Sequence, residues 1–249
     1  MAIINNLPLE MVQVIVDAIC PRCNQRSRRS MRDVHTIVDL ARTSKLFNQL
    51  ATPHLYHRPP LHKWPLLART LIDRPDLARH VKQLLVPQQT PERACDFWED
   101  RLWMKCGFPP QLVAYLDCQV NRLGFEDDLH PDYISILASL CPNLEKLEFQ
   151  DEEKMGGPYF PFCRPNSLQN LKKVNMSPPP YDECLGNGSG QSLSDYKALL
   201  RAAPNIQRLA VPNLVGSCGL EVLTLENLTH LDILQSALTA EDLGKLLTM

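Results

Sequence analysis

The chain has 249 residues and a mass of 28.3 kDa, and 44% of its residues are apolar and 22% charged. These proportions exclude a collagen, a coiled coil, a wholly disordered chain and a membrane channel. The net charge of −2 hides a division, because residues 1–90 carry 13 Lys and Arg against 6 Asp and Glu, whereas residues 91–249 carry 13 against 22. A basic first part and an acidic second part indicate two regions with different partners.

The first predicted helix covers residues 7–19. Met11, Ile15 and Ile19 recur at i, i+4 and i+8, which is the period of an amphipathic helix. Pro8 suits a first helical turn. The lack of a basic start and the charges at positions 10 and 17 argue against a signal peptide. We therefore expect a mature helix at the start of the chain.

Two further short helices are predicted after a basic loop at residues 22–32. The apolar pattern resumes over residues 33–42, and Ser44 can cap a third helix. Pro53 is expected to end that helix, since proline lacks the amide proton that an inner turn needs.

An apolar repeat follows, with the spacing apolar-x-x-apolar-x-x-apolar-x-apolar. A weaker sixth copy has Asp117 at its first position, followed by Val120, Leu123 and Phe125. The five clear copies are Ala78, Val81, Leu84, Val86; Cys141, Leu144, Leu147, Phe149; Leu168, Leu171, Val174, Met176; Ala203, Ile206, Leu209, Val211; and Leu225, Leu228, Leu231, Ile233. Most spacings between copies lie in the range of leucine-rich repeats, with insertions in the others.

Each copy ends in an alternating stretch that is typical of a strand with one buried face. Helical patterns over residues 133–140 and 193–202, the second with Ser194 as its cap, precede two of these strands, and Pro142-Asn143 and Pro204-Asn205 turn the chain into them. A helix–turn–strand unit repeated in one direction predicts an α/β fold with a curved parallel sheet and helices on its convex side.

The first 58 residues resemble an F-box of the type found in filamentous fungi. Leu7-Pro8-Leu9-Glu10, the segment 40–51 and Leu55-Tyr56 carry the resemblance. Phe47 stands where the family often has Trp, and the link after the first helix is longer than usual. Residues 59–249 resemble the irregular leucine-rich-repeat solenoid that often follows an F-box. The pattern of a helix without its strand at the C-terminus suggests a truncated chain.

The resemblance implies a non-enzymatic substrate receptor of a Skp–cullin–F-box ubiquitin ligase, acting in ubiquitin-dependent degradation. The head would bind a Skp-type adaptor, and through it a cullin, by apolar side chains at Leu7, Pro8, Met11, Ile15 and Ile19. The repeats would bind an unknown protein substrate through their strand-side surface and two insertions, residues 151–162 and 177–190. Tyr159, Phe160, Phe162 and Tyr181 are the candidate contact residues. The alternative is a leucine-rich-repeat scaffold for protein–protein interaction with no ligase role.

No catalytic, cofactor or metal constellation is predicted. Cys20-Pro21-Arg22-Cys23 lacks the preceding strand of a redox motif and the second ligand pair of a zinc site. Nine scattered cysteines without an export signal indicate reduced thiols, hence a cytoplasmic or nuclear protein. A pI of about 6.4 argues against nucleic acid, and no apolar stretch is long enough to cross a membrane.

Overall fold

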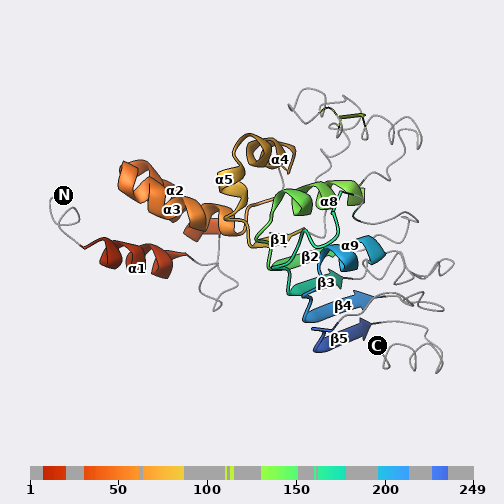
Figure 1. Ribbon diagram of the computed structural model, residues 1–249. Coiled ribbons are helices and arrows are strands. Elements are labelled where there is room, and N and C mark those ends of the chain that lie inside the picture. The colour runs from red at the N-terminus through yellow and green to blue at the C-terminus, as the bar shows by residue number, and fades with distance from the viewer. Residues whose placement is uncertain are drawn as a thin grey trace, which may run out of the picture.

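The computed structural model describes residues 8–20, 31–61, 64–86, 110, 113–114, 130–150, 160, 162–177, 196–212 and 226–234. These residues form helices and one parallel sheet, with most of the helices before the first strand (Figure 1). The helices of the first part are α1 (Leu9–Ile19), α2 (Met31–Thr43), α3 (Lys45–His57), α4 (Trp64–Asp73) and α5 (Pro75–Ala78). The elements that follow are β1 (Gln83–Leu85), α8 (His130–Leu140), β2 (Lys146–Gln150), β3 (Lys173–Ser177), α9 (Lys197–Ala202), β4 (Arg208–Pro212) and β5 (His230–Leu234).

The head, residues 1–58, has two small apolar clusters in its described part. Val12 and Val16 on α1 pack with Phe47 on α3, and Cys20 packs with Ile37, Ala41 and Ala51. Clusters of this kind hold three short helices together because each helix buries one row of apolar side chains. The predicted cap at Ser44 is confirmed, since its hydroxyl oxygen accepts a hydrogen bond from the backbone N–H of Phe47 at 3.2 Å.

The prediction that Pro53 ends α3 is wrong, because the helix continues through it to His57. Proline removes one hydrogen bond of the inner helix, and the packing of the last turn compensates. Leu55 packs against the Cys20 cluster of the head, while Tyr56 packs against the core of the residues that follow. The backbone N–H of Lys82 also donates to the carbonyl oxygen of His57 at 3.0 Å. Helix α3 is thus shared by the head and the body, residues 59–249.

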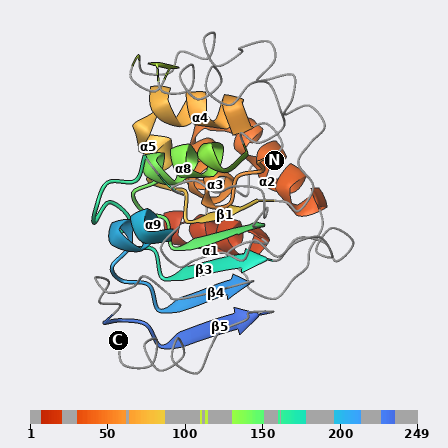
Figure 2. The same cartoon turned by 90° about the vertical axis from the view of Figure 1, so that its right-hand side faces the viewer.

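The five strands of the described residues are parallel and follow chain order β1-β2-β3-β4-β5. The third apolar positions of the five clear repeat copies are successive register partners across the whole sheet: Leu84, Leu147, Val174, Leu209 and Leu231. Figure 2 shows β3, β4 and β5 following one another in this way. The spacing of the apolar residues therefore predicted the strands, and the structure places equivalent positions of the repeat in register.

The weaker copy at residues 117–125 does not supply a strand between β1 and β2, since Leu84 pairs directly with Leu147. That copy lies outside the described residues, as does Ser194, and the N-cap of α9 is Tyr196. Asp117 at a position that is apolar elsewhere in the repeat is the sequence difference that sets this copy apart. The helix predicted over residues 133–140 is α8, which begins at His130.

One core fills the body between the sheet and the helices. On β3 the buried residues alternate with polar ones. The buried residues of the strands pack with apolar side chains of α4, α8 and α9. The burial of these apolar side chains is the main favourable contribution to the free energy of folding of the body. Its fully buried members include Leu71, Leu137, Leu144, Leu147, Leu171, Met176, Tyr196 and Leu199. Helices α8 and α9 lie beside the sheet (Figure 1).

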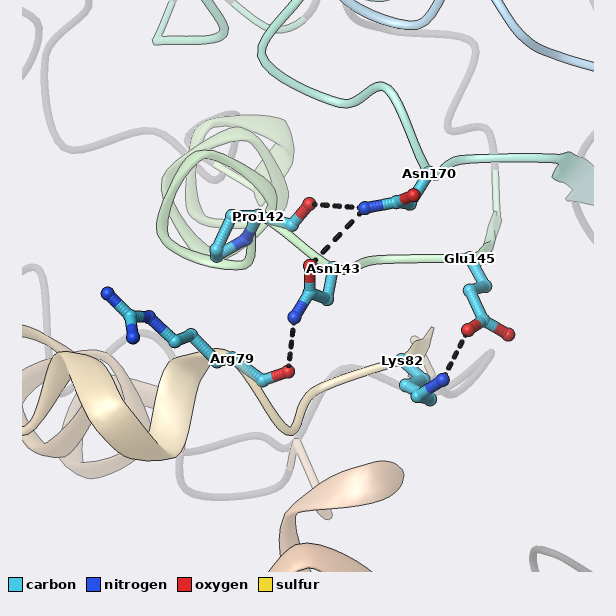
Figure 3. A network of polar contacts seen from close by, with 6 residues as sticks. All are labelled: Arg79, Lys82, Pro142, Asn143, Glu145 and Asn170. Atoms are coloured by element: carbon cyan, nitrogen blue, oxygen red, sulfur yellow. Dashed lines mark hydrogen bonds and ion pairs between the residues drawn. The ribbon is translucent and has the colours of Figure 1, made fainter.

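An asparagine in each turn ties one repeat unit to the one before it. Asn143 Nδ2 donates to the Arg79 carbonyl oxygen at 2.9 Å, and Asn170 Nδ2 donates to the Pro142 carbonyl oxygen and to Asn143 Oδ1, both at 3.3 Å (Figure 3). Asn205 donates to the Gln169 carbonyl oxygen at 2.9 Å. The bonds to Arg79, Pro142 and Gln169 supply hydrogen-bond donors to backbone carbonyl groups in the turns, which lie outside the strands.

Candidate functional site

The best candidate for a binding site is the outer side of α1. Val12 and Val16 face α3 and are buried, so one side of this helix belongs to the core of the head. A second, neighbouring side of the helix is also apolar: Met11 is 53% exposed, Val14 63% and Ile15 41%. A helix with apolar residues on two sides buries only one of them in the isolated chain.

We call Met11, Val14, Ile15 and Ala18 the α1 stripe. These four exposed residues are spaced at i, i+3, i+4 and i+7, so they form a continuous ridge along the helix. Leu9 on the same helix and Leu46 on α3 are exposed as well. Among the large hydrophobic residues described, only Leu66 on α4 is as exposed elsewhere. Such a concentration of exposed apolar side chains is typical of an interaction surface.

The five residues predicted to bind an adaptor divide into three groups. Pro8, Met11 and Ile15 are exposed. Ile19 is half-buried and packs against the Cys20 cluster, so its side chain contributes to the stability of the head. Leu7 lies outside the described residues. Val14 and Ala18 were not predicted, although the i+3 spacing from Met11 would have identified Val14.

The polar edge of α1 is fixed by a contact with α3. Asp17 Oδ1 lies 3.1 Å from Nε2 of His54, which is buried, while the Asp17 side chain stays half-exposed. Burial lowers the pKa of His54 below its usual value, and the nearby Asp17 carboxylate opposes this shift without reversing it. A neutral imidazole that donates to a carboxylate holds α1 in place without a buried charge.

One of the aromatic candidates for substrate binding belongs to the core of the body. Phe160 is 3% exposed and packs edge-on against Phe149, with 5.7 Å between the ring centroids. Phe162 is half-buried against the same core, and its backbone N–H donates to the buried hydroxyl of Ser135 on α8 at 3.2 Å. Phe160 is thus a core residue, and the prediction that it contacts substrate is corrected. Tyr159 and Tyr181 lie outside the described residues.

The described cysteines are buried and unpaired with one another. Cys20 ends α1 inside the head, whereas Cys23 lies outside the described residues. Burial raises the pKa of Cys141 and of Cys163 to about 12, which keeps both thiols protonated. Within the described residues no three His, Cys, Asp or Glu side chains gather as they would around a metal ion.

The helices of the described part are too short or too polar to cross a bilayer. Comparison of the chain with protein-family models, curated proteins and solved structures found no match. The α1 stripe and the parallel sheet therefore have to be interpreted from their own chemistry.

Proposed function

We propose that the chain is a substrate receptor of a Skp–cullin–F-box ubiquitin ligase. In this proposal the head is an F-box that binds a Skp-type adaptor, and the body is an irregular leucine-rich-repeat solenoid that binds a protein substrate. The chain itself catalyses nothing, and the ligase complex supplies the chemistry. The proposal also implies that the protein works in the cytoplasm or the nucleus.

The exposed α1 stripe is the observation that carries the proposal. A partner that covers these apolar side chains removes their surface from water, which favours binding by roughly 25 cal/mol for each Å² buried. A groove formed by partner helices would cover Met11, Val14 and Ile15 in the way an amphipathic helix is usually bound. Pro8 at the start of the same helix is exposed and matches the Leu-Pro start that the F-box resemblance rests on.

The sheet supports the second half of the proposal. Five parallel strands in chain order, aligned at equivalent apolar positions and linked by turn asparagines, are what a solenoid of stacked units requires. Such an array presents an extended surface in which each strand adds one row of side chains. A surface of that kind suits the recognition of a protein segment better than that of a small molecule.

The test is a titration of the full chain with a purified Skp-type adaptor, followed by calorimetry. The variant Met11→Glu/Ile15→Glu places two charges in the stripe and should weaken binding by about thirtyfold or more. Leu66→Glu is the matched control, because Leu66 is equally exposed but lies on α4. The control should bind like the unmodified chain, and circular dichroism establishes that each variant is folded.

Two outcomes would overturn the proposal. The first is a folded unmodified chain that does not bind the adaptor, in which case the body would be a protein-interaction scaffold and the stripe would serve another partner. The second is equal binding by the stripe variant and the Leu66 control, which would place the contact elsewhere on the head.

A further inference from the structure

The sheet has a polar face whose charges are ordered by the strand register. On this face Lys146, Lys173 and Arg208 occupy the same position on β2, β3 and β4, each one residue before a buried anchor. We call these three residues the basic row. Lys146 pairs in register with Lys173, and Lys173 with Arg208, so the three cations stand side by side across the strands. The next strand continues the row with His230.

The middle of the basic row is not neutralised by the described part of the chain. Lys146 has its own counterion, since its Nζ lies 2.6 Å from Glu148 Oε1. Lys173 and Arg208 are both exposed, and among the described residues neither has a carboxylate within ion-pair distance.

Two residues further along their strands stand Asn175 and Ala210, which are neutral, and Asp232 lies one strand beyond Ala210. Two cations on adjacent strands, about 4.8 Å apart, repel each other. A negatively charged partner would relieve this repulsion.

We propose that the basic row binds an acidic segment of a protein partner, lying extended across the strands. This deepens the proposed function by naming the class of substrate. Only the ubiquitination of the bound protein rests on the proposed function; the binding itself does not. From Lys146 to His230 the row spans three strand spacings, about 14 Å, which is the length of about four extended residues. Asn175 beside the row can hydrogen-bond the backbone of such a segment.

The chemistry of the face favours a peptide over a nucleic acid. The described residues of the polar face include no Phe, Tyr or Trp on which bases could stack. Glu148 and Asp232 stand two residues further along β2 and β5 than the row. A continuous phosphate backbone would bring charges against these carboxylates, whereas a peptide can place neutral residues there. The acidic body as a whole also lacks the broad positive field that draws nucleic acid to a protein.

The experiment uses the full chain without any adaptor, so it is independent of the test of the head. Fluorescence anisotropy measures binding of a labelled peptide in which Glu alternates with Ser, and of a second peptide in which Gln replaces every Glu. The acidic peptide should bind and the Gln peptide should not. The variant Lys173→Glu/Arg208→Glu should weaken binding of the acidic peptide by about tenfold or more, and added salt should weaken it for the unmodified chain.

A matched control separates the basic row from net charge. Lys45→Glu/Arg201→Glu makes the same change in charge at exposed positions on α3 and α9, and should alter the affinity by no more than about twofold. If the row variant unfolds, Lys173→Gln/Arg208→Gln replaces it. The proposal is overturned if the two peptides bind equally, if the control loses as much affinity as the row variant, or if a single-stranded oligonucleotide of equal charge binds more tightly than the acidic peptide.

Discussion

His54 on α3 and Asp17 on α1 form a polar contact between the first and third helices of the head, with 3.1 Å between the imidazole Nε2 and the carboxylate Oδ1. His54 is nearly inaccessible to water, whereas Asp17 is half-exposed. The pair therefore combines a neutral buried ring with a solvated charge, and its strength depends on pH.

We expect the head to lose stability on mild acidification. Burial lowers the pKa of His54 in the folded chain below the value of 6.5 expected when it is unfolded. Below about pH 6.5 the unfolded chain therefore binds a proton that the folded chain does not, and stability falls as the pH drops towards the folded pKa. Urea unfolding between about pH 8 and pH 5 measures this slope.

The variant His54→Gln should show a smaller slope, because it removes the titrating group and keeps a donor for Asp17. His35→Gln on the exposed side of α2 is the control and should keep the slope of the unmodified chain. An identical slope in His54→Gln would show that other groups cause the pH dependence.

The turn asparagines should contribute to stability individually. Asn170→Ala removes the bonds to Pro142 and Asn143 and should reduce the free energy of unfolding by about 1 kcal/mol. Gln169→Ala next to it removes a longer exposed side chain but leaves the backbone carbonyl that accepts from Asn205, so it should have little effect. Chemical denaturation of the two variants measures the difference, and equal stabilities would show that the hydrogen bonds of Asn170 add nothing to stability.

Replacement of a register anchor should cost far more than replacement of an exposed residue. Leu147 is fully buried between Leu84 and Val174 in the sheet, so Leu147→Ala should destabilise the chain by about 2–5 kcal/mol. Leu66→Ala makes the same chemical change on the exposed side of α4 and should be nearly neutral. Thermal unfolding of both variants checks the prediction, which fails if the two lose equal stability.

The thiols of Cys141 and Cys163 should resist alkylation as long as the body is folded. Their pKa values of about 12 leave almost no thiolate at neutral or mildly basic pH, and both side chains are buried. Treatment with iodoacetamide followed by mass spectrometry of the peptides should find both unmodified in buffer and modified in denaturant. Rapid labelling of Cys141 in buffer would mean that the unit around α8 opens readily.

The sequence predicted the strands well because each carries a strong local pattern. Leu147 and Phe149 alternate with polar residues, and Pro142-Asn143 marks the turn before them, so the strand and its direction follow from neighbouring residues. Equivalent positions then align across the sheet, because units of the same shape stack in the same way.

Other features depend on contacts between distant residues and could not be predicted locally. The aromatic insertion looks like an exposed binding loop, but Phe160 finds space beside Phe149 and its segment is held by Ser135 on α8. Helix α3 passes Pro53 because its last turn packs on both parts of the chain. The basic row was hidden by the net negative charge of the body, since only the strand register places Lys173 beside Arg208.

The sharing of α3 between the two parts has a geometric consequence. Leu55 packs in the head and Tyr56 packs in the body. The orientation of the head relative to the body is therefore set by one continuous helix and not by a flexible linker. One residue inserted between Leu55 and Tyr56 would turn the head by about 100° and move it by about 1.5 Å relative to the sheet. The helix therefore acts as a rigid spacer of fixed length. It keeps a partner bound to the polar face of the sheet in a constant orientation relative to a partner bound to the α1 stripe.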